Sequence, residues 1–303
     1  MRICCFGSMN LDYVYQVPHF VRPGETLSAS RRSVSCGGKG LNQSIAMARS
    51  GATVFHAGNV GATDGQILVS ALSCDGVDTT LIQLQNYASG HAVIQVNAQG
   101  ENCILLYGGA NITVTPEQVD EVLDRFSAGD WLVLQNEINL LPQIVAKARQ
   151  KGLTIALNAS PVEGLNKDFP LHEIDYLFVN EEEACSLAQA LPYDRALDVL
   201  AQGYPSMTVV CTLGREGATV RRGNRSVHQK AIPAKAVDTT GAGDTFLGYF
   251  IGSLVQGCAQ DEALSRALFA AHLCVQREGA AGSIPYANEV AQTMQAHMAG
   301  VEA

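Results

Sequence analysis

A short segment of the chain combines two glycines and a carboxylate at the start of an apolar helical pattern. Residues 238–244 read Asp-Thr-Thr-Gly-Ala-Gly-Asp, and the pattern that follows ends near Gly257. The first backbone N–H groups of a helix lack intrahelical partners and lie at its positive end, which favours bound anions. The segment therefore predicts a phosphate site at the first turn of this helix, which Gly241 to Asp244 should form. Asp244 would accept a proton from a hydroxyl that attacks a bound phosphoryl group, or would only complement the helix dipole.

A second glycine-rich loop lies near the other end of the chain. Residues 37–42 read Gly-Gly-Lys-Gly-Leu-Asn and open a helical pattern that runs to Arg49. The loop is no Walker A motif, because Gly40 follows the lysine where that motif has Ser or Thr. Lys39 and Asn42 are donors suited to sugar hydroxyls, although a purely structural loop explains the glycines equally well.

Further polar residues follow segments of strand type. Asn10 and Asp12 lie two residues apart in extended chain and so share one side, where they could orient a sugar or form an Asx turn. Asn180 and Glu183 have the spacing of a capping box, and Glu183 could also lie near a magnesium ion or its waters. Glu137 is a lone acid that spacing alone would leave as a solvated loop carboxylate.

Two weaker signals complete the set. The turn with Thr212, Gly214 and Gly217 could lie flat against a nucleotide. The seven histidines have no metal-ligand spacing, and His272 on an apolar helix is expected to be a core residue.

The elements that position these residues alternate between strand and helix. Apolar runs of strand length are expected at residues 2–6, 53–57, 131–134, 153–157, 176–179 and 208–212, with helical patterns between several of them. This alternation predicts an α/β fold with a parallel sheet covered by helices. Ligands of such sheets bind at the carboxyl ends of the strands, where Asn10, Glu137, Asn158, Asn180 and Gly214 would lie.

Two segments interrupt the alternation, at about residues 11–36 and 90–107. Both have the pattern of antiparallel strands, the second around a turn at residues 98–101. Together they could form a small sheet that closes over the site as a lid and excludes water, or remain an ordinary edge hairpin. A separate hairpin is expected around Gly223 and Asn224.

Composition narrows the classes of partner and location. The formal charge is −9, with no basic run longer than Arg221-Arg222, which disfavours nucleic acids and anionic membranes as partners. The nine cysteines include no C-x-x-C pair and fit a reducing compartment. We expect a cytoplasmic protein, since the first residues are unlike a signal peptide and no apolar run approaches a membrane span.

Taken together, these residues resemble the ribokinase family of carbohydrate kinases, of the phosphofructokinase-B type. The two specific signatures are Gly-Gly-Lys-Gly-x-Asn at residues 37–42 and Asp-Thr-x-Gly-Ala-Gly-Asp-x-Phe at residues 238–246. The resemblance runs from about Gly7 to Ser283 and implies one kinase domain over residues 1–303, with a three-layer α/β/α core and a small β-sheet lid. It implies transfer of the γ-phosphoryl group of ATP to the primary hydroxyl of a pentose, in the first place O5 of D-ribose.

The resemblance also implies roles for individual residues. Asp244 would be the general base, with the N–H groups of Gly241, Ala242 and Gly243 stabilising the transferred group. The sugar would be held by Asn10, Asp12, Gly38, Lys39, Asn42 and Glu137; ATP by Asn180, Glu183, Thr212, Gly214 and Gly217, with Glu183 serving Mg²⁺ indirectly. A potassium site would draw on Asp238, Thr240, Cys274, Arg277, Gly279 and Ser283. A homodimer through the lid is also implied.

Some residues depart from the family pattern. The loop at residues 61–65 is shortened, and His91 and Tyr107 are expected to face the sugar from the lid. Deoxyribose, fructose or adenosine are therefore alternative acceptors, and a sugar sensor without turnover is an alternative from another class. A dinucleotide-binding oxidoreductase is disfavoured, because Phe246 stands where its fingerprint needs glycine.

Overall fold

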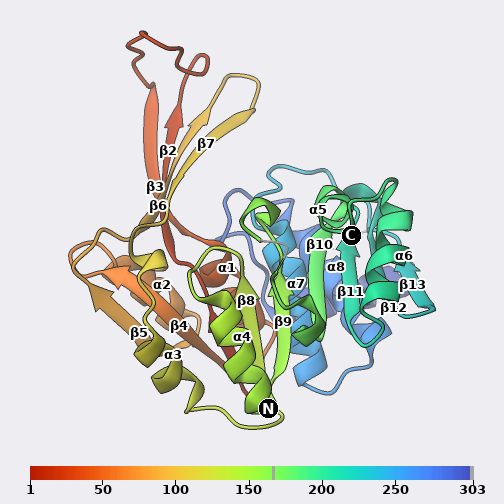
Figure 1. Cartoon of the computed structure of the whole chain (residues 1–303). Coiled ribbons are helices and arrows are strands. Elements are labelled where there is room, and N and C mark those ends of the chain that lie inside the picture. Colours follow the sequence, from red (N-terminus) through yellow and green to blue (C-terminus); the bar gives the residue numbers. More distant parts are fainter. Residues whose placement is uncertain (166–167, 301–303) are drawn as a thin grey trace.

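The computed structural model contains one large sheet and one small sheet (Figure 1). It describes residues 1–165 and 168–300. The nine strands of the large sheet are, in spatial order, β13 (Arg225–Gln229), β12 (Ala218–Arg222), β11 (Thr208–Thr212), β10 (Tyr176–Asn180), β9 (Thr154–Asn158), β8 (Trp131–Gln135), β1 (Ile3–Phe6), β4 (Val54–Gly61) and β5 (Asp78–Gln85). Seven neighbouring strands pair in parallel, and β12 and β13 add an antiparallel edge. The predicted mostly parallel sheet is confirmed.

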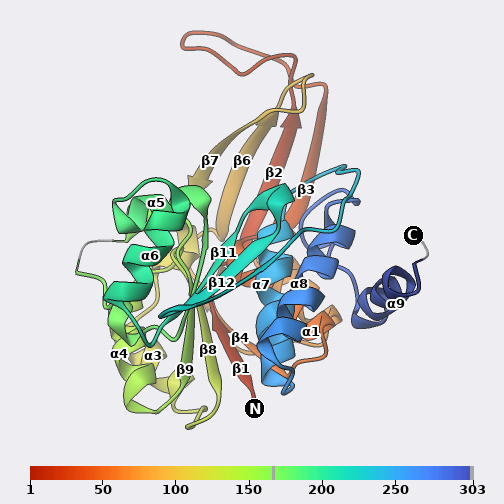
Figure 2. The same cartoon turned by 90° about the vertical axis from the view of Figure 1, so that its right-hand side faces the viewer.

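Helices cover both faces of the large sheet, as Figure 2 shows. One face carries α1 (Lys39–Arg49), α2 (Gln66–Cys74), α7 (Ala242–Val255), α8 (Gln260–Cys274) and α9 (Ala287–Met298). The other carries α3 (Pro116–Leu123), α4 (Leu141–Gln150), α5 (Glu181–Ala188) and α6 (Tyr193–Gly203). Short 3₁₀ turns occupy Gly109–Ile112, Val162–Gly164, Leu171–Glu173 and Gly214–Glu216. Each helix layer buries an apolar cluster against the sheet, which confirms the three-layer architecture.

The expected strands lie within two residues of their predicted starts, and most of the ends agree equally well. The run at residues 53–57 extends to Gly61, because β4 continues upward to pair with β5. The hairpin around Gly223 is present, with its second strand ending at Gln229. His272 is partly buried and its Nδ1 lies 3.3 Å from the Ile232 carbonyl oxygen, in keeping with a structural role.

A four-stranded sheet, called here the small sheet, projects from the edge of the body (Figure 1). Its spatial order is β3 (Arg31–Gly37), β2 (Asn10–Gln16), β6 (Gly90–Val96) and β7 (Asn102–Tyr107). The expected antiparallel pairing is present within each hairpin, that is between β2 and β3 and between β6 and β7. It is wrong for β2 and β6, the two strands through which the hairpins pair with each other. Strands β2 and β6 are parallel, because both leave the body in the same direction.

The prediction of a single domain over residues 1–303 includes positions 166–167 and 301–303, which lie outside the described residues. Within the described part of the chain, no helix has the length and apolar character needed to span a membrane.

Candidate active site

The anion turn forms at the start of α7. Gly241 is the N-cap residue and has a φ of 76°, a left-handed conformation that glycine adopts without strain. Helix α7 begins at Ala242, and Asp244 lies in its first turn. Gly257, with a φ of 89°, follows the helix end as predicted.

Helices α1 and α7 pack closely, so that their first turns meet. A Cβ atom at Gly248 would lie 2.3 Å from the Cβ of Ala46, and one at Gly252 would lie 2.0 Å from Oγ of Ser50. Only glycine allows this approach. As a result, the glycine loop ahead of α1 and the anion turn ahead of α7 lie next to each other, although about 200 residues separate them in the chain.

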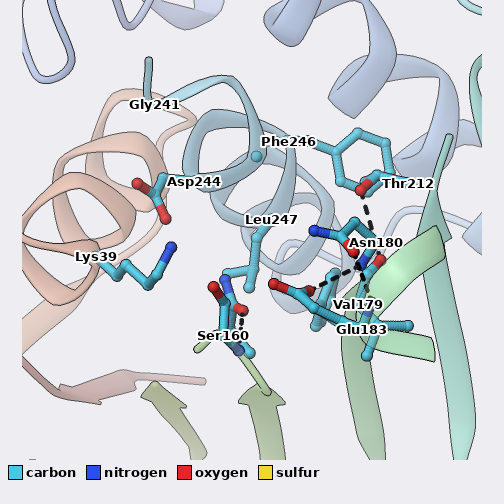
Figure 3. A pocket seen from close by; sticks show the side chains of 13 residues that line it. Lys39, Ser160, Val179, Asn180, Glu183, Thr212, Gly241, Asp244, Phe246 and Leu247 are labelled. Atoms are coloured by element: carbon cyan, nitrogen blue, oxygen red, sulfur yellow. Dashed lines mark hydrogen bonds between the residues drawn. The ribbon is translucent and has the colours of Figure 1, made fainter. Parts of the chain in front are cut away.

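A pocket opens between these turns and the ends of β9, β10 and β11 (Figure 3). Asp244 and Lys39 lie on one side of it, and Asn180, Glu183 and Thr212 lie on the other. The pocket brings together seven of the predicted site residues, namely Lys39, Asn180, Glu183, Thr212, Gly241, Gly243 and Asp244. Asn158, Ser160, Phe178, Phe246 and Leu247 line it as well, without having been assigned a role from the sequence.

Asp244 is almost fully buried, with 8% of its surface exposed. Its two carboxylate oxygens accept hydrogen bonds from side-chain amides of consecutive residues on α1. Nδ2 of Asn42 donates over 3.0 Å and Nε2 of Gln43 over 2.9 Å. The Oδ1 atom of Asn42 is buried and has no hydrogen-bond partner in the described part of the chain. A ligand hydroxyl that reached this atom would supply the missing donor.

Charges of both signs converge on Asp244. Burial alone would lower the pKa of Lys39, but the carboxylates of Asp244, Glu137 and Glu183 outweigh that effect and raise the pKa. Burial also raises the pKa of Glu137, with Lys39 and Ser8 opposing it. Ser8 donates to Oε2 of Glu137, which also accepts from the Lys39 backbone over 3.2 Å. Glu137 is thus fixed beside the glycine loop rather than solvated.

The start of β2 carries the remaining sugar-site candidates, Asn10 and Asp12. Asn10 is buried, and its Oδ1 accepts from Nδ2 of Asn111 over 2.7 Å. Oδ1 of Asn111 in turn accepts from the Met9 backbone over 3.0 Å. These bonds fix the amide of Asn10 so that its nitrogen is the group left to donate. Asn111 therefore belongs to the site as a residue that orients Asn10.

Asp12 faces the same region from β2. Burial, together with the nearby charge of Glu137, raises the pKa of Asp12 to about 6. The expectation that His91 and Tyr107 also face the sugar is wrong, because strand register places them beside Leu11, on the other side of the small sheet. There His91 contacts Tyr13 and Tyr107, with ring centroids 5.8 and 4.9 Å apart.

On the second hairpin of the small sheet, the residues that lie beside Asp12 on its side are apolar. Ala92 pairs with Asp12 and Leu106 pairs with Ala92, so both belong to the face directed toward Glu137. Side chains alternate between the faces of a strand, so a shift of one residue exchanges the two sets. The register, which the sequence does not display, decides which lid residues could contact a sugar.

On the nucleotide side, Asn180 and Glu183 form the predicted capping box. Oδ1 of Asn180 accepts from the Glu183 backbone over 2.8 Å, and Oε2 of Glu183 accepts from the Asn180 backbone over 2.9 Å. Both residues still line the pocket. Gly214 and Gly217 shape the turn between β11 and β12, with φ values of 54° and 103°, and lie next to the pocket residue Thr212 rather than in its lining.

The six candidates for a cation site also lie together. Burial alone would raise the pKa of the Asp238 carboxyl, but hydrogen bonds outweigh it and lower the pKa. The carboxylate accepts from the Thr240 hydroxyl over 2.7 Å and from the backbone of Thr240 and of Gly279, each over 2.9 Å. Sγ of Cys274 lies 3.1 Å from Oγ of Ser283. The Arg277 guanidinium is a cation without an acceptor atom and pairs with Glu289, so Arg277 could serve an ion only through its backbone carbonyl.

Known proteins with sequences similar to this chain are carbohydrate kinases. The model of the pfkB family of carbohydrate kinases matches residues 1–287. The chain is similar to a ribokinase of Staphylococcus aureus, at 36% identity over 307 residues that cover 96% of this chain and 99% of that protein.

The solved structures to which this chain is similar include ribokinases. A ribokinase from Thermotoga maritima superposes with a TM-score of 0.90 at 31% identity, covering 97% of this chain and 99% of the other. Arabidopsis thaliana ribokinase complexed with ribose and ATP superposes with a TM-score of 0.86 at 29% identity, covering 97% and 98%.

Proposed function

Because the chain belongs to the pfkB family of carbohydrate kinases, we propose that it transfers the γ-phosphoryl group of ATP to O5 of D-ribose. The observation that carries this proposal is the meeting of a buried carboxylate, Asp244, with Lys39 and the glycine turn in one pocket. Phosphoryl transfer asks a protein mainly for in-line positioning and for stabilisation of charge. The pocket offers both.

In this proposal the sugar lies between the glycine loop and the small sheet. Its hydroxyls bind Asn10, Asp12, Asn42 and Glu137, with Gly38 and Lys39 beside them, while Ala92 and Leu106 cover an apolar side. The Oδ1 atom of Asn42, which has no donor in the described part of the chain, accepts a hydrogen bond from a sugar hydroxyl. Asp244 takes the proton of the attacking hydroxyl, and the N–H groups of Gly241, Ala242 and Gly243 stabilise the charge on the phosphoryl group. The small sheet acts as the lid that excludes water.

ATP lies on the side of the pocket formed by Asn180, Glu183 and Thr212, next to the turn of Gly214 and Gly217. Glu183 would hold Mg²⁺ in part through water, and the ion would supply positive charge that shields the phosphates. Potassium would bind oxygens of the loops at residues 238–240 and 274–283, where the Asp238 carboxylate already ties both loops together. A cation there would add to the positive field of the anion turn.

The proposed function is tested by measuring ADP release with Mg-ATP and potassium. D-ribose, 2-deoxyribose, fructose and adenosine are compared with a blank that lacks acceptor. Selective turnover with ribose supports the proposal. Faster turnover with another of these acceptors would change the assigned substrate and leave the assigned reaction, phosphoryl transfer from ATP, unchanged. Sugar binding without any turnover would overturn the proposed ribose kinase activity and favour either an untested acceptor or a sensor.

The first mutational prediction concerns Asp12. Since its folded-state pKa of about 6 exceeds that of an unfolded aspartate, ionisation of Asp12 weakens the folded state. The penalty is absent below about pH 4, grows through about pH 6 and is complete above it, at most about 3 kcal/mol. Asp12→Asn should therefore raise Tm at pH 8 and leave it unchanged at pH 4, while weakening ribose binding by about 10- to 100-fold, because a charged acceptor is lost.

Thermal unfolding at the two pH values and calorimetric titration with ribose measure these effects. Asp124→Asn is the matched control, because it removes the same charge from a side chain that is 67% exposed. A variant with unchanged ribose affinity would exclude Asp12 from the sugar site.

The second prediction concerns assembly, since we also propose a homodimer through the small sheet. Strand β7 is exposed along its length, and Leu105 and Val34 expose 71% and 43% of their surface on one face. Exposed apolar residues that gather on one face are typical of interaction surfaces. Leu105→Lys should shift the protein from dimer to monomer in sedimentation velocity. Leu191→Lys, at an isolated leucine that is 75% exposed, should leave the dimer intact. A monomeric wild-type protein would contradict the proposal.

The nine cysteines carry no disulfide. Their free state supports a cytoplasmic location, where thiols stay reduced.

A further inference from the structure

We propose that Gln43 and Gln135 are positioning residues that hold the Asp244 carboxylate in the orientation needed to accept the proton. They form a relay that runs from the end of β8 through α1 to α7. Nε2 of Gln135 donates to Oε1 of Gln43 over 2.8 Å, and Nε2 of Gln43 donates to Oδ1 of Asp244 over 2.9 Å. The inference rests on the proposed role of Asp244 as the base.

The direction of the hydrogen bonds in this relay follows from the Asp244 carboxylate, at which the relay ends. An ionised carboxylate only accepts hydrogen bonds, so Gln43 must present its NH₂ group to Asp244. The carbonyl oxygen of Gln43 then points the other way and needs a donor, which only the NH₂ group of Gln135 supplies within the described part of the chain. Turning either amide over would place two oxygens or two NH₂ groups against each other. Each glutamine therefore has one permitted orientation.

Complete burial gives the relay its effect. Gln43 and Gln135 are both 0% exposed, so water cannot replace a lost bond. A buried amide without its partner turns toward whatever partner it can find, at a cost comparable to that of an unsatisfied polar group. Without Gln135, the carbonyl oxygen of Gln43 loses its donor, and the amide is no longer held in place on that side. A shift of the Gln43 amide would lengthen its bond to Oδ1 of Asp244, and the carboxylate would lose its fixed orientation toward the attacking hydroxyl.

Two residues near the end of β8 have different roles in this arrangement. Gln135 is the last residue of that strand and points to the base, while Glu137, two residues later, faces the sugar site. Asn42, the neighbour of Gln43, already fixes the second oxygen of Asp244. Gln43 and Gln135 contact no ligand in this arrangement and are expected to affect the chemical step rather than substrate binding.

The test is kinetic and uses the full-length chain. Gln43→Met and Gln135→Met keep the side-chain length and remove the donors. We expect kcat to fall by about 100-fold in Gln43→Met and by about 10-fold in Gln135→Met, with KM for sugar and for ATP within about threefold. Because the residues act in series, the double variant should lose no more than Gln43→Met alone.

Gln118→Met is the matched control. Gln118 is a buried glutamine, 1% exposed, that donates to Oδ1 of Asn59 over 2.7 Å and lies outside the pocket. It should lose stability while keeping kcat. Either relay variant alone tests the inference, so misfolding of one leaves the other decisive.

Three outcomes would overturn the relay: kcat within twofold of wild type in a folded variant, equal changes in KM and kcat, or additive losses in the double variant. Asp244→Asn is measured in parallel to keep the two proposals apart. Turnover in Asp244→Asn would contradict the proposed base. Inactive Asp244→Asn with fully active glutamine variants would contradict only the relay.

Discussion

Replacing Asp244 by asparagine is expected to lower kcat by about 10³-fold or more, because the attacking hydroxyl loses its base. Ribose and ATP should still bind with nearly unchanged affinity. Their proposed contacts come from Asn10, Asp12 and Glu137 on one side and from the capping box of α5 on the other. The measurement is steady-state ADP release together with calorimetric titration of each substrate.

The asparagine also changes the local hydrogen bonds, which the controls must separate from catalysis. Its new NH₂ group would face an NH₂ group of Asn42 or Gln43, so a small loss of stability is expected. Asp130→Asn is the matched control. Asp130 is 7% exposed and accepts from Arg2 over 2.6 Å, far from the pocket, so its replacement should lower Tm while kcat stays. Near-normal turnover in Asp244→Asn would remove Asp244 from the mechanism.

The sequence predicted those parts of the fold and site that depend on local patterns. Apolar runs and their spacing predicted the strands, the start and end of α7, and the capping box at Asn180. The glycine signatures predicted the two turns that border the pocket. In each of these cases the interaction joins residues only a few positions apart, so spacing along the chain reflects distance in space.

Contacts between distant parts of the chain escaped the same reasoning. Gln43 bonds to Asp244 across 201 residues, and Asn111 bonds to Asn10 across 101. No local period encodes such pairs. A glutamine on the buried face of a helix is a usable signal, since it needs a partner, but it does not say which one. The prediction for His91 was wrong for another reason. Strand register alone decides on which face of the small sheet its side chain lies.

The anion turn allows a prediction in which stability and activity separate. A Cβ atom added at Gly243 would have no heavy atom within 4 Å among the neighbours outside its own turn, so Gly243→Ala should fold normally. Alanine is also the better helix former, by up to about 1 kcal/mol, so Tm should stay or rise. Gly243 nevertheless lines the pocket, and the new methyl group would occupy space that the phosphoryl group needs.

Displacing that group by about 1 Å is expected to reduce kcat by about 100-fold, because in-line attack depends on distances of that size. The measurement is kcat and KM for ATP beside thermal unfolding. Gly203→Ala at the end of α6, where a Cβ atom also meets nothing within 4 Å, should leave turnover unchanged. Full activity in Gly243→Ala would mean that the phosphoryl group does not approach the turn at Gly243. If Tm stays or rises while kcat falls by about 100-fold, glycine at position 243 is needed to make room for the phosphoryl group and not to stabilise the fold.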